Sequence, residues 1–338
     1  MKKRIIILIS SILIVILLLG LLQMLVVPKY TDNTEGLLIG EYYAQAGEND
    51  VIFVGDCEVY ESFVPAVLYE KYGITSYVRG SAQQLVWQSY YLLEETFRKE
   101  TPKAVVFNVY ALKYGTPQDE AYNRMTLDGM KWSGSKYRAI KASMTEGESM
   151  LDYVFPLLRF HSRITELGSD DLKYMFADKE VSHSGYLMKK GVAPMTEEAE
   201  SGRALLDYTL SDTAMDYLDK MRELCEANGS ELILVKAPTN TWGFWWYDEW
   251  DAQVIEYAES NGLAYYNFIK CKDEIGIDFS TDTYDEGMHL NVYGAEKLTE
   301  YFGNILKESH GLDKAEHSQN VIDRWQANID AYYKERNS

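Results

Sequence analysis

The sequence has few cysteine and proline residues and lacks the common metal-binding motifs. Only 3 of its 338 residues are cysteine, and only 7 are proline. Cys57, Cys225 and Cys271 are too few for a disulfide framework, and no CxxC pair predicts a zinc site. The sequence has no HExxH segment, which argues against a metal hydrolase. No glycine-rich phosphate loop follows an apolar segment, so a flavodoxin-like nucleotide-binding protein is not expected.

Positive charge is also scarce. The chain has 33 Lys and Arg against 52 Asp and Glu, which gives a net charge of −19. Such a surface repels phosphate groups, so no nucleic-acid partner is expected. The 46% of hydrophobic and 25% of charged residues are typical of a packed globular chain and exclude a disordered one. The length suits one large α/β domain plus an appendage, or two ordinary domains.

One long apolar run lies near the N-terminus, at Ile5–Val27. At 1.5 Å per residue it makes about 35 Å of helix, enough to cross a hydrocarbon core about 30 Å thick. It is too long for the apolar part of a typical signal peptide and lacks a small-residue cleavage site, so we expect an anchor rather than a cleaved signal. The basic residues 2–4 precede it, which predicts a single-pass cell-membrane protein with a cytoplasmic N-terminus and an extracytoplasmic main domain.

Short apolar segments alternate with helical ones along the rest of the chain. Apolar segments without polar alternation, joined by helices, indicate a parallel sheet covered on both faces. Strands are expected at 51–54, 75–79, 104–109, 231–235 and 264–268. Helices are expected at 34–45, 60–72, 82–99, 150–167, 213–228, 248–261 and 292–309.

Composition divides the chain into successive parts. The α/β domain is expected at 51–312, interrupted by a helical insertion at about 112–210 that lacks the strand–helix rhythm. The other parts are the tip and anchor at 1–28, a polar stalk at 29–50, and a polar, peripheral C-terminal helix at 313–338.

Two sequence blocks stand at strand ends, where the chemistry of a doubly wound sheet gathers. Gly55-Asp56-Cys57 follows the first strand, and the segment from Asp285 to His289 precedes the last helix. In order and position they resemble the blocks of the SGNH/GDSL hydrolase family, which are Gly-Asp-Ser and Asp-x-x-His. The resemblance covers roughly 51–309. It implies a flavodoxin-like three-layer sandwich with a five-stranded parallel sheet in the order 2-1-3-4-5, and no cofactor.

The resemblance also implies a role for each site residue. Cys57 occupies the nucleophile position and His289 that of the general base. The oxyanion donors would be the backbone amides of Cys57 and Gly80 and the side-chain amide of Asn108. A thiol at the start of a helix lies near the positive end of the helix dipole, which favours the thiolate, and a neighbouring imidazole can take its proton.

Two departures from the family pattern concern the nucleophile and the third member of the triad. The family serine is Cys57 here, and a Cys–His pair can transfer an acyl group through a thioester. Glu286 stands three residues before His289, where the family has Asp, and Asp285 stands four before it. We rank Asp285 first, because a one-residue loop insertion at Met288 would let it reach the imidazole.

Several of these residues also have simpler interpretations. Cys57 could be a small core residue, Asn108 a turn residue, and Gly80 a glycine kept for a positive φ. Asp56 is a candidate for binding substrate but is equally suited to hydrogen-bonding the turn. The other candidates for substrate binding are the aromatic residues after the fourth strand, whose alternative is a hydrophobic plug or an interaction patch: Trp242, Trp245 and Trp246.

Together these features predict a membrane-anchored SGNH-type acyltransferase or esterase. With its anchor, the chain looks like the D-alanine transfer protein of teichoic acid operons and like anchored polysaccharide O-acetyltransferase partners. That likeness implies a cell-envelope polysaccharide or an acylated carrier as substrate, and it leaves room for a membrane-embedded acyltransferase as partner. The alternative, motivated by the serine replacement and the shifted carboxylate, is a catalytically inactive binding or assembly module of the cell envelope.

Overall fold

The five segments expected as strands form one parallel sheet in the computed structural model. The sheet order is β2-β1-β3-β4-β5, which confirms the predicted fold class and order. β1 pairs with β2 on one side and with β3 on the other, so that Val51 lies opposite both Ser76 and Ala104. The strands are β1 (Val51–Gly55), β2 (Ser76–Gly80), β3 (Ala104–Asn108), β4 (Glu231–Lys236) and β5 (Ala264–Asn267).

The structure describes residues 2–27, 34–45, 47–176, 181–195, 204–240, 244, 246–314 and 316–338. They divide into two units, and each is described by itself. The larger unit consists of Glu35–Ser143 and Glu180–Ser338 and contains the sheet. The smaller unit consists of Met1–Thr34 and Met144–Lys179.

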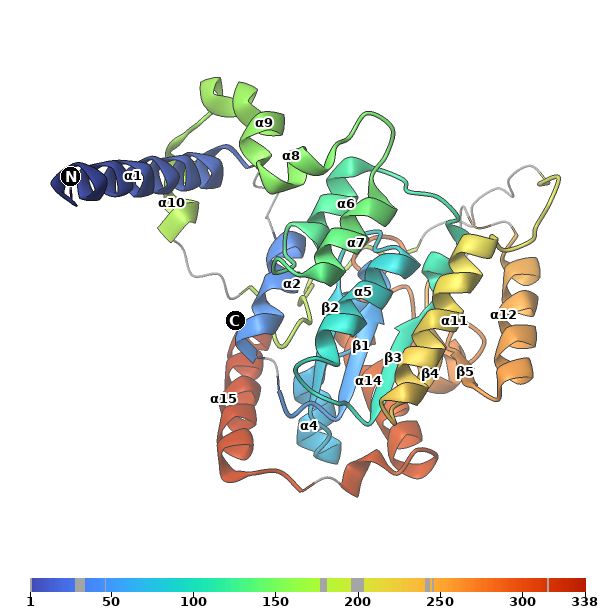
Figure 1. The fold of residues 1–338 in the computed structure, drawn as a ribbon. Helices are drawn as coiled ribbons and strands as arrows, with labels where there is room; N and C mark the ends of the chain where they lie inside the picture. Colours follow the sequence, from blue (N-terminus) through green and yellow to red (C-terminus); the bar gives the residue numbers. More distant parts are fainter. Residues whose placement is uncertain are drawn as a thin grey trace. The chain divides into compact units, whose positions relative to one another are not determined.

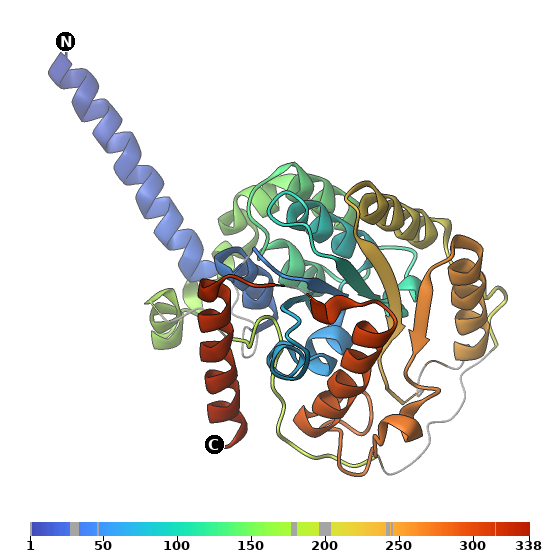
Figure 2. The same ribbon diagram turned by 90° about the horizontal axis from the view of Figure 1, so that it is seen from below.

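Helices cover both faces of the sheet (Figures 1 and 2). Alternate strand residues point to opposite faces, so that Phe53 and Val54 of β1 belong to two separate hydrophobic cores. The first core is covered by α3 (Cys57–Ser62), α4 (Pro65–Tyr72) and α14 (Val292–Glu308). The second is covered by α5 (Val86–Thr96), α11 (Asp212–Ala227) and α12 (Tyr247–Asn261). This is the three-layer arrangement that the uninterrupted apolar strands predict.

Two predicted helices are broken at a proline. The helix expected at 60–72 is divided into α3 and α4, with Pro65 as the first residue of α4. The helix expected at 150–167 is divided in the same way by Pro156. Proline has no N–H and clashes with the preceding turn, so it begins a helix more readily than it continues one.

Two segments with polar composition pack more closely than expected. The predicted stalk contains α2 (Thr34–Gln45), but Leu38 and Tyr42 of this helix are fully buried. The C-terminal helix α15 (Gln319–Arg336) is held by buried Trp325 and Tyr332 and is not peripheral. A few large apolar side chains on one face are enough to bury a helix whose other positions are polar.

The predicted insertion contributes to both units. Its first helices, α6 (Glu120–Leu127) and α7 (Gly134–Ser143), belong to the larger unit, where α7 packs on α5. The smaller unit contains α1 (Lys2–Val26), which is long and apolar enough to cross a membrane and has an exposed apolar surface. It also contains α8 (Met150–Val154), α9 (Pro156–Phe160), the 3₁₀ helix η2 (His161–Thr165) and α10 (Ser169–Phe176).

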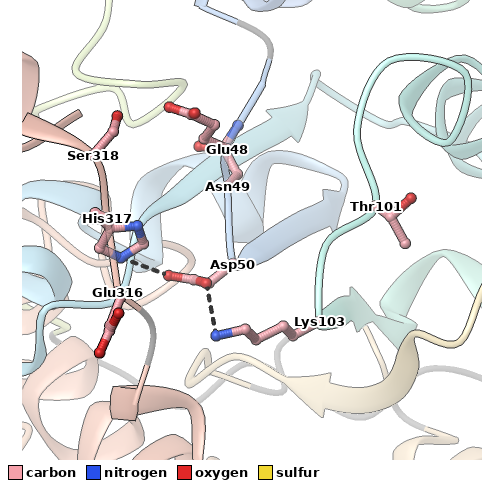
Figure 3. A pocket seen from close by; sticks show the side chains of 8 residues that line it. All are labelled: Glu48, Asn49, Asp50, Thr101, Lys103, Glu316, His317 and Ser318. Carbon is pink, nitrogen blue, oxygen red and sulfur yellow. Dashed lines mark ion pairs between the residues drawn. The ribbon is translucent and has the colours of Figure 1, made fainter. Parts of the chain in front are cut away.

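A cavity of about 340 Å³ lies at the edge of the sheet where the strands begin (Figure 3). Asp50, which directly precedes β1, lies 3.2 Å from Lys103 Nζ and 3.1 Å from His317 Nε2. Its carboxylate also accepts hydrogen bonds from the backbone N–H and the hydroxyl of Thr75. Because His317 lies just before α15, these contacts attach the C-terminal helix to the sheet.

The Asp50 network yields a stability prediction. Asp50→Asn removes the charge that pairs with Lys103 and His317, and we expect it to lower the free energy of unfolding by about 2 kcal/mol. The measurement is urea unfolding of the full chain in detergent at pH 7.

Lys71→Ala is the matched control. It breaks an ion pair with Glu300 in which both partners are well exposed, so its effect should be below about 1 kcal/mol. Equal effects of the two substitutions would contradict a structural role for the buried network.

Candidate active site

Three of the predicted site residues meet at the edge where the strands end. Cys57 begins α3 directly after β1, while Asp285 and His289 lie in the loop before α14. The Nε2 atom of His289 lies 3.0 Å from the Sγ atom of Cys57. Its Nδ1 atom lies 2.5 Å from Oδ2 of Asp285. This is the order thiol, imidazole, carboxylate that nucleophilic catalysis requires.

The loop geometry explains why Asp285, and not Glu286, contacts the imidazole. Glu286 and Gly287 both have positive φ, 62° and 90°, so the chain bulges at this point. The bulge turns the Glu286 side chain outward and leaves Met288 exposed. Asp285 stays in place because its Oδ1 accepts a hydrogen bond of 2.7 Å from the backbone N–H of His289. The extra residue of the loop therefore lies outside the site.

A second carboxylate, Glu61, approaches His289 from α3. Its Oε2 atom lies 3.7 Å from Nδ1 of His289, and the side chain is buried. The hydroxyl of Tyr284 donates to both carboxylate oxygens at 2.9 Å, and the Tyr284 ring stacks on the imidazole. Our sequence reasoning missed Glu61. The pattern that could have revealed it is its position four residues after Cys57, on the same face of a helix.

Burial and neighbouring charges shift the pKa values of Cys57 and His289. Burial raises the pKa of Cys57, and the neighbouring His289 cation opposes that rise. This differs from the lowered pKa expected at a helix start, because the loss of solvent outweighs the short helix. Burial would lower the pKa of His289, but Cys57, Asp285 and Glu61 together raise it to about 12. The imidazolium that forms when His289 takes the thiol proton is therefore strongly stabilised.

The side-chain amide of Asn108 is already engaged beneath the thiol. It donates to Oδ1 of Asp56 at 3.1 Å and to Oε2 of Glu58 at 2.9 Å, and its oxygen accepts from the backbone N–H of Ala237. Lys236 donates to both oxygens of Glu58 at 2.8 Å, which completes a buried ion pair. Both amide hydrogens are thus used within the protein. The structure does not present Asn108 as an oxyanion donor.

The contacts of Asp56 and Gly80 suit a structural role. Asp56 is buried and caps α3 by accepting from the backbone N–H of Glu58, which matches the turn interpretation rather than substrate binding. Burial, reinforced by Glu58, raises the pKa of Asp56 to about 7. Gly80 does not have a positive φ, but a Cβ atom there would lie 3.2 Å from the backbone oxygen of Asp56 and from the Tyr60 ring. A side chain at this position would push the two strand ends apart.

The structure shows a cation on the same edge that sequence reasoning did not single out. The 3₁₀ helix η1 (Val109–Lys113) follows β3, and its Lys113 Nζ lies 3.3 Å from the centre of the Tyr110 ring and 4.9 Å from that of Tyr114. Burial lowers the pKa of Lys113 to about 8, against the attraction of Asp56 and Glu58. Among the described residues, Lys113 has no anionic partner in contact, so its charge is available to a bound group.

The aromatic segment after β4 is only partly described. Trp246 packs against Phe244, with ring centres 4.9 Å apart, and against Tyr208. This packing at the edge of the second core favours the hydrophobic plug for Trp246. Trp242 and Trp245 lie outside the described residues. In the described part of the chain, no group of three or more His, Cys, Asp and Glu side chains is placed to hold a metal ion.

Comparisons with known proteins find similar solved structures, among them two bacterial proteins. A scan against protein-family models finds no match, and a search of curated proteins finds no similar sequence. One structure is a Bacteroides fragilis protein assigned as an acylhydrolase, with 12% identity over 80% of this chain and 94% of that one, at a TM-score of 0.39. The other is a GDSL-like lipase from Bacteroides thetaiotaomicron, with 12% identity over 81% and 99%, at a TM-score of 0.38.

The reactivity of Cys57 tests its contact with the imidazole. His289→Ala removes the cation that opposes the rise in the thiol pKa, so less thiolate is present at pH 7.5. We expect alkylation of Cys57 by iodoacetamide to slow by about tenfold for each unit of pKa increase. Mass spectrometry of the labelled peptides measures the rate.

Two other free cysteines serve as internal controls. Cys271 is half-buried near Glu274, and its rate should stay unchanged. Cys225 is buried and should stay unlabelled as long as the variant is folded. An unchanged rate at Cys57 in folded His289→Ala protein would contradict the proposed coupling.

Glu61 makes stability depend on pH. Burial raises its pKa from 4.5 to about 7, so the folded protein holds a proton that the unfolded chain has released. The stability that this proton provides is present below pH 4.5 and is lost as the pH rises through 7. Glu61→Gln stays neutral, so between pH 4.5 and 8 its stability relative to the wild type should rise by about 3 kcal/mol.

Thermal unfolding at the two pH values checks this expectation. The matched control is Glu274→Gln, because exposed Glu274 also accepts a hydrogen bond from a tyrosine, Tyr301, but is solvated in both folded and unfolded chains. A pH-independent difference between Glu61→Gln and the wild type would show that the carboxyl is not protonated in the folded protein.

Proposed function

We propose that the protein is a membrane-anchored acyl-transfer enzyme of the SGNH/GDSL type, with Cys57 as nucleophile. The observation that carries the proposal is the 3.0 Å contact between Cys57 Sγ and His289 Nε2, with Asp285 on the other imidazole nitrogen. Thiol, base and orienting carboxylate come from two segments more than 200 residues apart, at the edge where such sheets hold their active sites. The two similar structures, an acylhydrolase and a GDSL-like lipase by name, are consistent with this chemistry.

The first half of the reaction forms a thioester. His289 Nε2 takes the proton of Cys57, and the sulfur attacks the carbonyl carbon of the acyl donor. Negative charge develops on the carbonyl oxygen. The backbone amides of Cys57 and Gly80 are the candidate donors to it, and Lys113 supplies positive charge in place of the engaged Asn108 amide. When the intermediate collapses, the leaving alcohol takes the proton from His289 and the acyl group stays on sulfur.

The second half transfers the acyl group. An acceptor hydroxyl, from a sugar or from water, gives its proton to His289 and attacks the thioester carbonyl. The carbon–sulfur bond breaks, and the Cys57 thiolate recovers the proton from the imidazolium. Asp285 and Glu61 stabilise the imidazolium in both halves, because they lie 2.5 Å and 3.7 Å from its Nδ1 atom.

The substrate class follows from where the enzyme resides. α1 begins with the basic residues 2–4, which favours a cytoplasmic N-terminus and an extracytoplasmic larger unit. An enzyme tethered there acts on polymers of the cell envelope, so the proposed acceptor is an envelope polysaccharide. An acylated carrier, or a membrane-embedded acyltransferase as partner, would supply the acyl group.

The second candidate is a catalytically inactive binding or assembly module. One observation favours it: both hydrogens of the Asn108 amide are engaged by Asp56 and Glu58, so the family oxyanion donor is missing. Such a module would bind glycan without ever forming a thioester. Trapping of acylated Cys57 therefore separates the two functions.

Hydrolysis of p-nitrophenyl acetate by the full chain in detergent tests the enzyme. Cys57→Ala removes the nucleophile and should lower kcat by about 10⁴-fold. Asp285→Asn keeps the shape but loses the charge that orients the imidazole, so a loss of similar order is expected. Mass spectrometry of the quenched wild type should find the acetyl group on Cys57.

Cys271→Ala is the control, because it removes a thiol of similar burial that contacts no histidine. Lys113→Met should lower kcat by about tenfold to a hundredfold without blocking acetylation of Cys57. Unchanged turnover by folded Cys57→Ala protein would exclude the proposed nucleophile.

A further inference from the structure

The smaller unit attaches a group of short helices to the end of α1. α9, η2 and α10 contact α1, and Val26 in its last turn is buried. The most apolar stretch of α1 is fully uncovered. Because each residue adds 1.5 Å, burial confined to the last turn places these helices within about 6 Å of the end of α1.

Arg163 of η2 fixes this attachment. Its guanidinium donates to the backbone oxygens of Val26 and Val27 at 2.8 and 3.0 Å. Glu166 and Asp171 hold the same guanidinium at 3.8 and 3.4 Å. The last carbonyls of a helix have no partner within the helix, and a cation there also complements the helix dipole. Arg163 therefore caps the C-terminus of α1 and holds the short helices next to it.

Residues 150–166 expose several large apolar side chains beside polar ones such as Arg159 and Glu166. Leu151, Phe155 and Leu158 are 57%, 54% and 56% exposed, and Ile164 is 50% exposed. Leu151 belongs to α8, Leu158 belongs to α9, and Phe155 lies at the break between the two helices. Tyr153, between them, is buried. This pattern is the reverse of a helix in a water-soluble protein, whose apolar face is covered.

We propose that residues 150–164 lie in the membrane interface, with Leu151, Phe155 and Leu158 inserted among the lipid chains of the leaflet where α1 ends. The occupant is a bilayer because Arg163 ties the same group of helices to the end of α1, whose uncovered apolar surface suits lipid. Interfacial helices of this kind bury their apolar face about 5–10 Å into the boundary between headgroups and chains. The proposal is independent of the chemistry at Cys57.

Charge on the segment favours apolar insertion over attraction to anionic lipid. Residues 150–164 have one acidic and two basic residues, and one of the basic residues, Arg163, is already paired. Attachment to anionic headgroups requires an excess of basic side chains. Zwitterionic phosphatidylcholine is therefore sufficient as the lipid.

Hydrophobic photolabelling of the full chain tests the proposal. The protein is placed in phosphatidylcholine nanodiscs with one chain per disc, and a diazirine reagent that partitions into the acyl chains is activated by light. Peptide mass spectrometry should find label on α1 and on residues 150–164. Trp132 and Tyr137 of the larger unit are 54% and 51% exposed, so they form an internal control that should stay unlabelled.

A triple variant, Leu151→Gln with Phe155→Gln and Leu158→Gln, sharpens the result. Label on residues 150–164 should fall to the level of Trp132 and Tyr137, while label on α1 stays. A Trp132→Gln and Tyr137→Gln variant should leave the pattern unchanged. The proposal is overturned if, in single-chain discs, α1 is labelled and residues 150–164 are not, or if Trp132 is labelled equally. Labelling that appears only with anionic lipid would also contradict it.

Discussion

The parallel direction of all five strands is the constraint on which the site depends. It places the end of β1, the end of β3 and the end of β4 at one edge, so Cys57, Asn108 and Lys236 lie close together although they are far apart in the sequence. The same constraint gathers the beginnings of β1 and β3 at the opposite edge, where Asp50 and Lys103 attach the segment before α15. One edge of the sheet thus holds Cys57 and the groups around it, and the other holds the C-terminal helix.

Much of this arrangement was predictable from local features. Five uninterrupted apolar segments separated by helices specify a parallel sheet, and the rule that polar strand ends share an edge placed Cys57 near His289. The break between α3 and α4 was also readable, since Pro65 marks it, but it was missed. These features succeed because each depends on a few neighbouring residues or on the direction of a strand.

The rest depends on partners that only the folded chain brings together. The contacts of Asn108 were not foreseen, because its amide meets Asp56 and Glu58, and the charge of Glu58 is balanced by Lys236 from another strand. The burial of α2 and α15 was missed because their polar composition outweighs a few apolar residues, of which Tyr42 is one. Long-range pairing and burial therefore set the limits of what local sequence could predict here.

Two carboxylates around His289, Asp285 and Glu61, favour the charged form of its imidazole. Asp285 and Glu61 both face Nδ1, so the imidazole is held as a cation more firmly than by a single carboxylate. Burial raises the pKa of both Cys57 and Glu61, which limits the charge that this water-poor site holds before substrate arrives. Loss of the Glu61 proton above pH 7 therefore adds a second negative charge beside an imidazolium that Asp285 stabilises at lower pH.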